Sequence, residues 1–270
     1  MVNAQTDDAR PLPPDLEGLG RRLSEHGRAF RLLAHTVSTN DDARVWAAEG
    51  APSGAVVCAD AQSGGRGRQG RAWSTPPGET LALSVILRPT LPVPDLPKIA
   101  LAAGLAARRA IDAALGRSAA KVKWPNDVLI DDRKICGVLS EAVLAGGRVE
   151  HVVVGVGINV ARREFPPDLA AVATSLALEG GSSDRAALAL GLLEALEDEV
   201  ARLVSDARGI GARLAPHDAL LGREVLFDDG TCGVAHGVDA DGRLTVRTAG
   251  GVIRAIAGEV RLAPRTDRRG

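Results

Sequence analysis

Short apolar runs of strand length, separated by turns rich in glycine and proline, occupy most of the chain before residue 160. Their β-branched content and length are those of buried strands. The predicted strands are 30–37, 55–62, 81–89, 121–130, 133–143 and 151–160. Tight turns join the last three, so we expect these three strands to lie side by side.

Helical spacing of apolar residues falls between and after these runs. Ser38, Thr39 and Asn40 provide capping residues for a helix that ends near Gly50. Other helices are predicted at 15–28, at 97–115 with an end at Gly116, and at 184–206 with Ser182 or Ser183 as the cap. Strands and helices alternate irregularly, which favours an α/β fold with a mixed sheet over strict βαβ repeats.

The pattern changes from Gly222 onwards. Short β-like runs (EVLF, CGVAHGV, RLTVRT and VIRAIAGEV) are separated by DDG, DADG and AGG turns, which predicts a small all-β barrel or sandwich. The predicted organisation is a partly disordered leader (1–29), a larger domain (30–215), a β domain (216–264) and a tail (265–270).

Composition limits the kind of protein. The chain has 270 residues, 45% of them hydrophobic and 25% charged, which is typical of a folded globular protein. The net charge of -1 provides no overall field for attracting DNA or an anionic membrane. With no Tyr, three Phe and three Trp, a platform that stacks several bases is not expected, and any recognition of anions must be local.

The sequence contains neither a targeting segment nor the cysteine spacing of a disulfide-rich or zinc-binding protein. No apolar run has the length of a signal peptide or of a membrane span, so a cytoplasmic protein is predicted. Cys58, Cys136 and Cys232 lie far apart and form no CxxC pair, which argues against a disulfide framework and a zinc site.

A glycine- and arginine-rich segment, SGGRGRQGR at 63–71, follows the second strand. Its three spaced glycines match GxGxxG, but Pro76 and Pro77 prevent the helix that a dinucleotide site needs, and no Walker A lysine follows. Arg66, Arg68 and Arg71 instead suggest guanidinium groups that converge on one phosphate or carboxylate. A solvated basic loop is the alternative.

Polar residues also interrupt the fourth apolar run. Lys123 and Trp124 precede a proline, and Asn126 and Asp127 follow it, with side chains available for polar contacts. Asp127 alone is equally typical of a turn. Lys134 begins an apolar strand, so we expect its stem to lie along buried surface and its ammonium group at the edge of a cleft.

Two glycines, Gly155 and Gly157, interrupt the β-branched run VGVGIN at 154–159. Glycine within a strand often marks close approach of a ligand, although a bulge or tight packing explains it equally well. Residues 38–40 are similarly explained by helix capping alone. Together, however, these segments place polar or glycine-rich clusters at strand ends, where α/β sheets usually bind ligands.

These residues resemble the biotin protein ligase family. The resemblance rests on STN at 38–40, the run from 65 to 73, KWPND at 123–127 with RK-x-x-G at 133–137, and GVGIN at 155–159. It extends from about residue 30 to 263 and includes the small predicted β domain. It implies a catalytic domain with a mixed sheet, related to class II aminoacyl-tRNA synthetases and lipoate ligases, followed by an SH3-like domain.

The resemblance also implies the chemistry. Biotin and ATP form biotinoyl-AMP, with Mg²⁺ bound mainly through the ATP phosphates, and a lysine of a biotin carboxyl carrier protein domain then takes the biotinoyl group. The implied catalytic residues are Lys134, Arg68 and Lys123. The implied biotin-binding residues are Ser38, Thr39, Asn40, Gln62, Arg66, Gly67, Arg68 and Lys134. The implied nucleotide-binding residues are Arg71, Trp73, Asn126, Asp127 and Asn159.

Repressor members of the family carry about sixty residues of DNA-binding domain, whereas about thirty precede the first predicted strand here, so we do not expect DNA binding. The oligomeric state is left open, a homodimer included. Three alternatives remain: a lipoate ligase, a sensor of biotin or acyl-adenylate without catalysis, and a nucleic-acid-binding module. The arginine-rich loop argues against the first, the retained basic residues against the second, and charge and aromatic content against the third.

Overall fold

A mixed seven-stranded sheet forms the centre of the computed structural model, which describes residues 10–263. Its strands, in spatial order, are β1 (Phe30–Thr36), β2 (Val56–Gln62), β3 (Thr80–Leu87), β7 (Arg148–Asn159), β6 (Arg133–Ala145), β5 (Asp127–Ile130) and β4 (Lys121–Lys123). β1 and β2 are parallel and the other neighbours are antiparallel. The predicted mixed α/β fold is confirmed, and β5, β6 and β7 are adjacent as expected.

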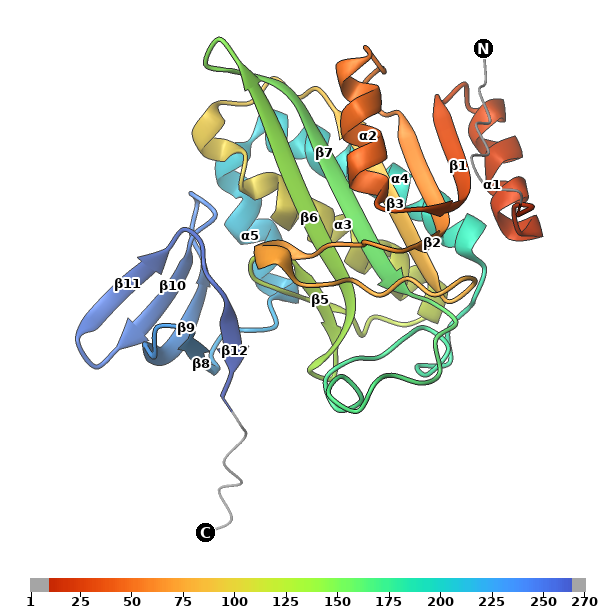
Figure 1. Ribbon diagram of the computed structural model, residues 1–270. Coiled ribbons are helices and arrows are strands. Elements are labelled where there is room, and N and C mark those ends of the chain that lie inside the picture. The colour runs from red at the N-terminus through yellow and green to blue at the C-terminus, as the bar shows by residue number, and fades with distance from the viewer. Residues whose placement is uncertain (1–9, 264–270) are drawn as a thin grey trace.

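Helices cover both faces of this sheet (Figure 1). α2 (Thr39–Ala48) packs alanines against Val57, Ile86 and Val153 on one face. On the other face α1 (Pro14–Glu25), α3 (Lys98–Leu115) and α4 (Arg185–Ser205) enclose the main core, and α1 buries Leu16, Leu19 and Leu23 completely. Because the core is mostly aliphatic, it fills without the aromatic residues that the chain lacks.

Two details of the larger body differ from the expectation. The predicted single strand 121–130 is a hairpin of β4 and β5, because residues 124–126 form a turn between them. The cap of α4 is Asp184, whose carboxylate accepts from the backbone N–H of Ala187 at 2.9 Å; neither predicted serine occupies this position.

A five-stranded antiparallel sheet follows, in the spatial order β11–β10–β9–β8–β12. Its strands are β8 (Glu224–Phe227), β9 (Cys232–Val238), β10 (Leu244–Thr248), β11 (Gly251–Ala255) and β12 (Val260–Leu262). The last predicted run is therefore two strands, separated where Gly258 has a φ of +133°. Short helices complete the chain: η1 (Arg68–Gly70), η2 (Val93–Asp95), η3 (Ala207–Gly209), α5 (Ile210–Leu214) and η4 (Ala215–His217).

Side-chain contacts hold the small sheet against the edge of the large one. The indole N–H of Trp124 donates to the carbonyl of Gly242 at 3.0 Å, and Arg223 forms a bidentate ion pair with Asp132. Trp124 is almost fully buried, so this part of the KWPND motif is structural. The contacts bring the β11–β12 turn up to the loop that crosses the large sheet (Figure 1).

Between residues 10 and 263, no helix combines the length and apolar character needed to cross a bilayer. The three cysteines are free, with Cys58 and Cys136 buried and Cys232 exposed. The predicted tail, 265–270, and residues 1–9 of the predicted leader lie outside the described residues, so disorder there stays a prediction.

Candidate active site

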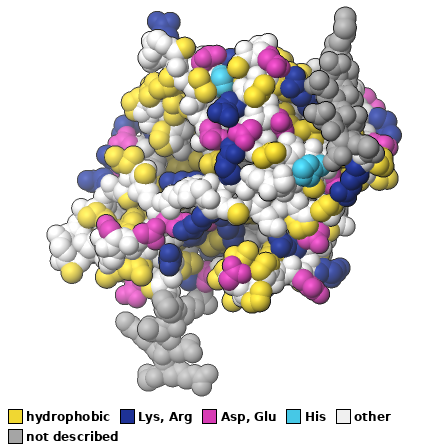
Figure 2. All heavy atoms as spheres, viewed as in Figure 1, with side chains coloured by type: hydrophobic (Ala, Val, Ile, Leu, Met, Phe, Trp, Pro, Cys, Tyr) yellow, Lys and Arg dark blue, Asp and Glu magenta, His cyan; other side chains and the backbone are white. Residues whose placement is uncertain are grey.

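A cavity of about 710 Å³ lies on the face of the large sheet that carries α2, under the loop 63–75 and beside the small sheet. In Figure 2, Lys and Arg side chains gather in the middle of this face. Every candidate residue from the sequence lines the cavity: Ser38, Thr39, Asn40, Gln62, Arg66, Gly67, Arg68, Arg71, Trp73, Lys123, Asn126, Asp127, Lys134 and Asn159. The fold therefore brings together segments separated by more than a hundred residues.

One end of the cavity is formed by the start of α2. Ser38 occupies the N-cap position, but its side chain makes no capping hydrogen bond; instead Gln62 Oε1 accepts from the backbone N–H of Thr39 at 2.8 Å. Gln62 Nε2 in turn donates to Thr75 Oγ1 at 2.9 Å. Capping alone therefore does not account for the side chains of residues 38–40.

The hydrogen-bond chain continues across the sheet through Asn40. Its Oδ1 accepts from Ser84 Oγ at 2.7 Å, and its Nδ2 donates to Glu141 Oε2 at 2.7 Å. Both ends of the buried amide are thus fixed, one of them by a carboxylate. Sequence reasoning missed Ser84, Thr75 and Glu141, because each lies in a strand or loop where no motif marks it.

Gly155 and Gly157 are required by close packing on β7. A Cβ atom at Gly155 would overlap the amide of Asn40, and one at Gly157 would overlap the indole ring of Trp73. Neither glycine has a positive φ, so the backbone itself would accept alanine. The two glycines therefore make room for two cavity side chains. Of the explanations left open by the sequence, the structure favours tight packing.

The arginine-rich loop does not direct its three guanidinium groups at one point. Arg66 makes a bidentate ion pair with Asp41 of α2, with both distances 2.7 Å. Arg68 donates to the carbonyl of Gly258 at 3.2 Å, and Arg71 pairs with Glu259, both at the β11–β12 turn. The expected convergence is wrong for this structure: each arginine has its own partner within the molecule.

The surroundings of the loop arginines shift the pKa values of Arg66, Arg68 and the partner Asp41. The hydrogen bonds from Arg66 hold the pKa of Asp41 below its ordinary value, and the same contact raises the pKa of Arg66. Burial lowers the pKa of Arg68, and the nearby charge of Asp127 acts against that effect.

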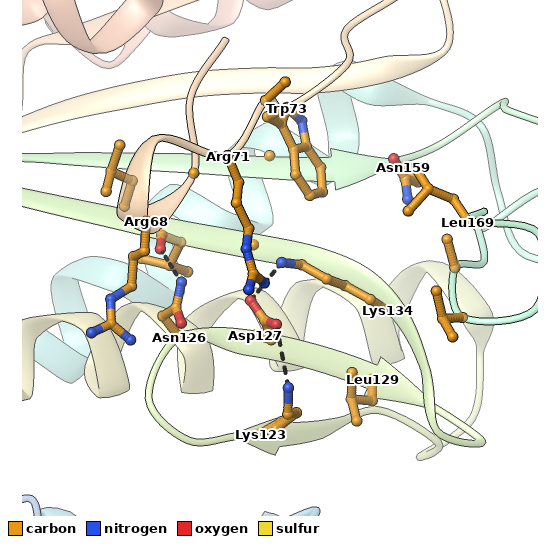
Figure 3. Close-up of a pocket in the computed structure, with 18 of the residues that line it drawn as sticks. Arg68, Arg71, Trp73, Lys123, Asn126, Asp127, Leu129, Lys134, Asn159 and Leu169 are labelled. Atoms are coloured by element: carbon orange, nitrogen blue, oxygen red, sulfur yellow. Dashed lines mark hydrogen bonds and ion pairs between the residues drawn. The ribbon is translucent and has the colours of Figure 1, made fainter. Parts of the chain in front are cut away.

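Asp127 lies between two lysines at the centre of the cavity (Figure 3). Its carboxylate oxygens lie 2.7 Å from Lys134 Nζ and 3.9 Å from Lys123 Nζ, and Arg71 points toward it from the loop above. Lys134 also lies 5.5 Å from the centre of the Trp73 ring. Burial lowers the pKa of Lys123, which the charge of Asp127 partly offsets, while Lys134 and Arg71 reinforce it.

The two remaining predicted polar residues donate hydrogen bonds from their side-chain amides to backbone carbonyls. Asn126 Nδ2 donates to the carbonyl of Val138 at 2.7 Å, and Asn159 Nδ2 donates to that of Thr174 at 2.9 Å. Asn126 thus joins the β4–β5 turn to β6, and Asn159 joins β7 to the segment after it. Both line the cavity while supporting its walls.

An apolar wall at the far end was not anticipated. Phe165, Leu169 and Val172 come from the irregular segment between β7 and α4 and line the cavity near Asn159. Arg223 and Glu259 come from the small β domain. No sequence signal distinguishes these residues, because they lie in a loop and in turns whose placement depends on tertiary contacts.

The balance of charge in the cavity differs sharply from that of the chain. Eight basic side chains line it and three acidic ones. The basic residues are Arg66, Arg68, Arg71, Lys123, Lys134, Arg162, Arg223 and Arg261, and the acidic residues are Asp127, Asp132 and Glu259. Because the cavity also has a neutral polar end and an apolar end, it suits a long ligand, or two ligands in contact, with negative charge in the middle.

Comparison with known proteins agrees with this geometry. Residues 33–159 match the Biotin/lipoate A/B protein ligase family. The chain is 34% identical to the Biotin--[acetyl-CoA-carboxylase] ligase of Mycobacterium tuberculosis, over 94% of this chain and 98% of that protein. The chain belongs to the biotin protein ligase family. It is also 33% identical to the bifunctional ligase/repressor BirA of Bacillus subtilis, over 86% of this chain and 74% of that protein.

The fold is shared with solved members of the biotin protein ligase family. The biotin protein ligase of Aquifex aeolicus in complex with biotin and ATP superposes with a TM-score of 0.74 at 27% identity, over 87% of this chain and 98% of that one. The expected architecture, a mixed-sheet catalytic domain followed by a small β domain, is therefore that of the family.

Proposed function

We propose that this cavity joins biotin to ATP and passes the biotinoyl group to a lysine of a biotin carboxyl carrier protein domain. The observation that carries the proposal is the order of surfaces along one cavity: a hydrogen-bonding end at α2, a basic centre and an apolar end. Biotin has a polar ring system and a carboxylate, and ATP has phosphates and an aromatic base whose flat faces can pack against apolar side chains. The two ligands placed end to end bring their charged groups together at the centre.

In the first step the carboxylate of biotin attacks the α-phosphorus of ATP, the bond to the β-phosphate breaks, and pyrophosphate leaves. Two anions must approach, so positive groups fixed beforehand lower the barrier. Lys134, Arg68 and Lys123 have this role in the proposal. Lys134 lies nearest the centre, and leaves Asp127 to contact the reacting oxygens.

Binding roles follow the two ends. Biotin contacts Ser38, Thr39, Asn40, Gln62, Arg66, Gly67, Arg68 and Lys134 in the proposal. The nucleotide contacts Arg71, Trp73, Asn126, Asp127 and Asn159. In the protein alone Arg66 pairs with Asp41 and Arg71 with Glu259, so in the proposal each guanidinium group binds its ligand in addition to, or in place of, that partner.

Magnesium fits this cavity as a companion of the nucleotide. The described residues contain no group of three or more His, Cys, Asp and Glu side chains placed to hold a metal, whereas Mg²⁺ bound to phosphates keeps several waters and needs few protein ligands. When bound, it supplies positive charge at the phosphate oxygens. The lysines and arginines of the cavity act on the remaining oxygens.

In the second step the amine of the acceptor lysine attacks the acyl carbon, and AMP leaves. The protein needs no nucleophile of its own, because the mixed anhydride is already activated. The partner is the carrier domain of a biotin-dependent carboxylase, acetyl-CoA carboxylase by analogy with the ligase from Mycobacterium tuberculosis. We also propose that the protein is cytoplasmic, in keeping with its three free cysteines.

Two linked assays test this function. The first measures pyrophosphate release from ATP with biotin, lipoate or octanoate, and we expect release with biotin only. The second follows labelled biotin onto a purified carrier domain, with a carrier whose acceptor lysine is replaced by arginine as the control. Release with lipoate in place of biotin, or binding of biotin without pyrophosphate release or transfer, would overturn the proposal in favour of a lipoate ligase or a sensor.

A further inference from the structure

A buried carboxylate behind the cavity connects three parts of the fold. Glu179 lies in the segment between β7 and α4, and its side chain is 7% exposed. Its Oε1 accepts from Arg133 at 2.8 Å and from Thr174 Oγ1 at 2.7 Å, and its Oε2 accepts from Arg117 at 3.3 Å. Glu179 does not itself line the cavity.

Two of these partners adjoin candidate site residues. Arg133 immediately precedes Lys134 at the start of β6. The backbone N–H of Thr174 donates to the carbonyl of Lys134 at 2.9 Å, and the carbonyl of Thr174 accepts from Asn159 at 2.9 Å. One carboxylate therefore fixes both sides of the backbone pairing that holds Lys134 and supports Asn159.

The same pairing positions the apolar end of the cavity. The backbone N–H of Lys134 donates to the carbonyl of Val172 at 2.7 Å, and Ala173 forms an isolated parallel bridge with Lys134, so the turn segment 169–174, here called the strap, ends beside the start of β6. Leu169, Val172 and Ala173 in this strap line the cavity. Moving Thr174 would therefore move the apolar wall and the lysine backbone together.

The charges make Glu179 hard to replace. Two guanidinium groups share one buried carboxylate, and charge-assisted hydrogen bonds of this kind are about twice as strong as neutral ones. An amide at this position keeps one acceptor but loses the negative charge between two arginines. Repulsion between the arginines and the unmatched amide N–H groups would then displace Arg133 or Thr174.

We infer that Glu179 is a positioning residue for adenylate formation: it holds Lys134 and the strap 169–174 in register with the reacting centre. The inference rests on the proposed function. The hydrogen-bond network at Asn40 and Gln62 shares no contact with Glu179, so among the proposed biotin contacts only that of Lys134 should depend on Glu179. The expected signature is a loss in the rate of biotinoyl-AMP formation and in ATP affinity, with a much smaller loss in biotin affinity.

The experiment compares Glu179→Gln with Glu199→Gln in the full-length protein. Glu199 is a matched control, because it is equally buried and pairs with Arg213 at 3.3 Å but does not line the cavity. We expect Glu179→Gln to slow single-turnover biotinoyl-AMP formation at least tenfold and raise the KM for ATP, with the biotin Kd within twofold. The control should keep its rate within twofold even where its Tm falls.

Thr174→Val provides a milder test should Glu179→Gln fold poorly, since it removes one hydroxyl donor and keeps the shape. Amide hydrogen exchange of 169–174 gives a readout without catalysis: it should quicken in Glu179→Gln and Thr174→Val but not in Glu199→Gln. Unchanged exchange with an unchanged rate, or equal losses of rate and biotin affinity, would overturn the inference. Inactivity of the unmodified protein would instead count against the proposed function, while exchange would still decide the role of Glu179.

Discussion

Replacing Gly155 by alanine tests the link between the glycines of β7 and ligand binding. The new methyl group would overlap the amide of Asn40. That amide is buried and held at both ends, by Ser84 and Glu141, each at 2.7 Å. Since the backbone at Gly155 accepts alanine, the substitution acts through Asn40 and not through strain in the strand.

The magnitude follows from the two hydrogen bonds. One neutral hydrogen bond contributes about 1 kcal/mol and one to a carboxylate about 1.5–3 kcal/mol, and partial relaxation of Asn40 will recover some of this. In the variant the displaced Asn40 must return to its original position, against the new methyl group, when biotin binds; a cost of about 2–3 kcal/mol for that step corresponds to a biotin Kd raised roughly 30- to 150-fold.

The assay is calorimetric titration of biotin, paired with steady-state adenylation at varied ATP. Gly157→Ala is the matched control, because its methyl group would overlap the Trp73 ring instead. We expect Gly155→Ala to weaken biotin binding and Gly157→Ala to raise mainly the KM for ATP. In an Asn40→Ala background, Gly155→Ala should add little, because the overlapping amide is gone.

Three results would refute this reasoning. A biotin Kd within twofold of the parent in Gly155→Ala would show that Asn40 does not matter for biotin. Equal effects of the two substitutions on both ligands would show general damage to β7. Full additivity in the Asn40→Ala background would show that the methyl group acts independently of the Asn40 amide.

Further predictions concern charge, docking and pH. Lys134→Ala should slow adenylation by about 100-fold or more, far more than it weakens biotin binding, and comparable losses in both would remove its catalytic role. Trp124→Phe should lower the free energy of unfolding by about 1–2 kcal/mol in urea titrations, since it removes an indole hydrogen bond between the two sheets; no change would mean that the contact is dispensable. Because Arg66 lowers the pKa of Asp41, their pair stabilises the folded state above the ordinary aspartate pKa and is lost as the pH falls through the lowered value. Asp41→Asn should therefore cost up to about 1 kcal/mol at neutral pH and nothing at low pH in denaturation curves, and a difference that grows on acidification would be contradictory.

Most elements could be predicted from the sequence, because the apolar runs are short, β-branched and well separated by turns. The prediction failed where local rules compete. A proline after Trp124 indicated an extended chain, but residues 124–126 form a hairpin turn there, a position that proline equally suits. Asp184, and neither Ser182 nor Ser183, is the N-cap residue of α4; all three are good capping residues, so the sequence alone does not choose between them.

The site was predictable to the extent that its residues occur in motifs. Lys134, Asp127 and Asn40 stand out as polar residues at the ends of apolar runs. Glu179 and Glu141 do not, because an acidic residue acquires its role only when tertiary contacts bring two or three donors around it. The partners of the loop arginines were likewise hidden, since Asp41 and Glu259 are distant in sequence and unremarkable in pattern.

The central claim is that one cavity holds both ligands with their charged groups at the lysine and arginine centre. A crystal structure with biotin and a non-hydrolysable ATP analogue tests it most directly. We expect the biotin ring system beside Asn40 and Gln62, the base near Leu169, and Lys134 Nζ moved from Asp127 to the carboxyl or α-phosphate oxygens. Ligands bound in separate places, or Lys134 still paired with Asp127 and out of reach of both, would contradict it.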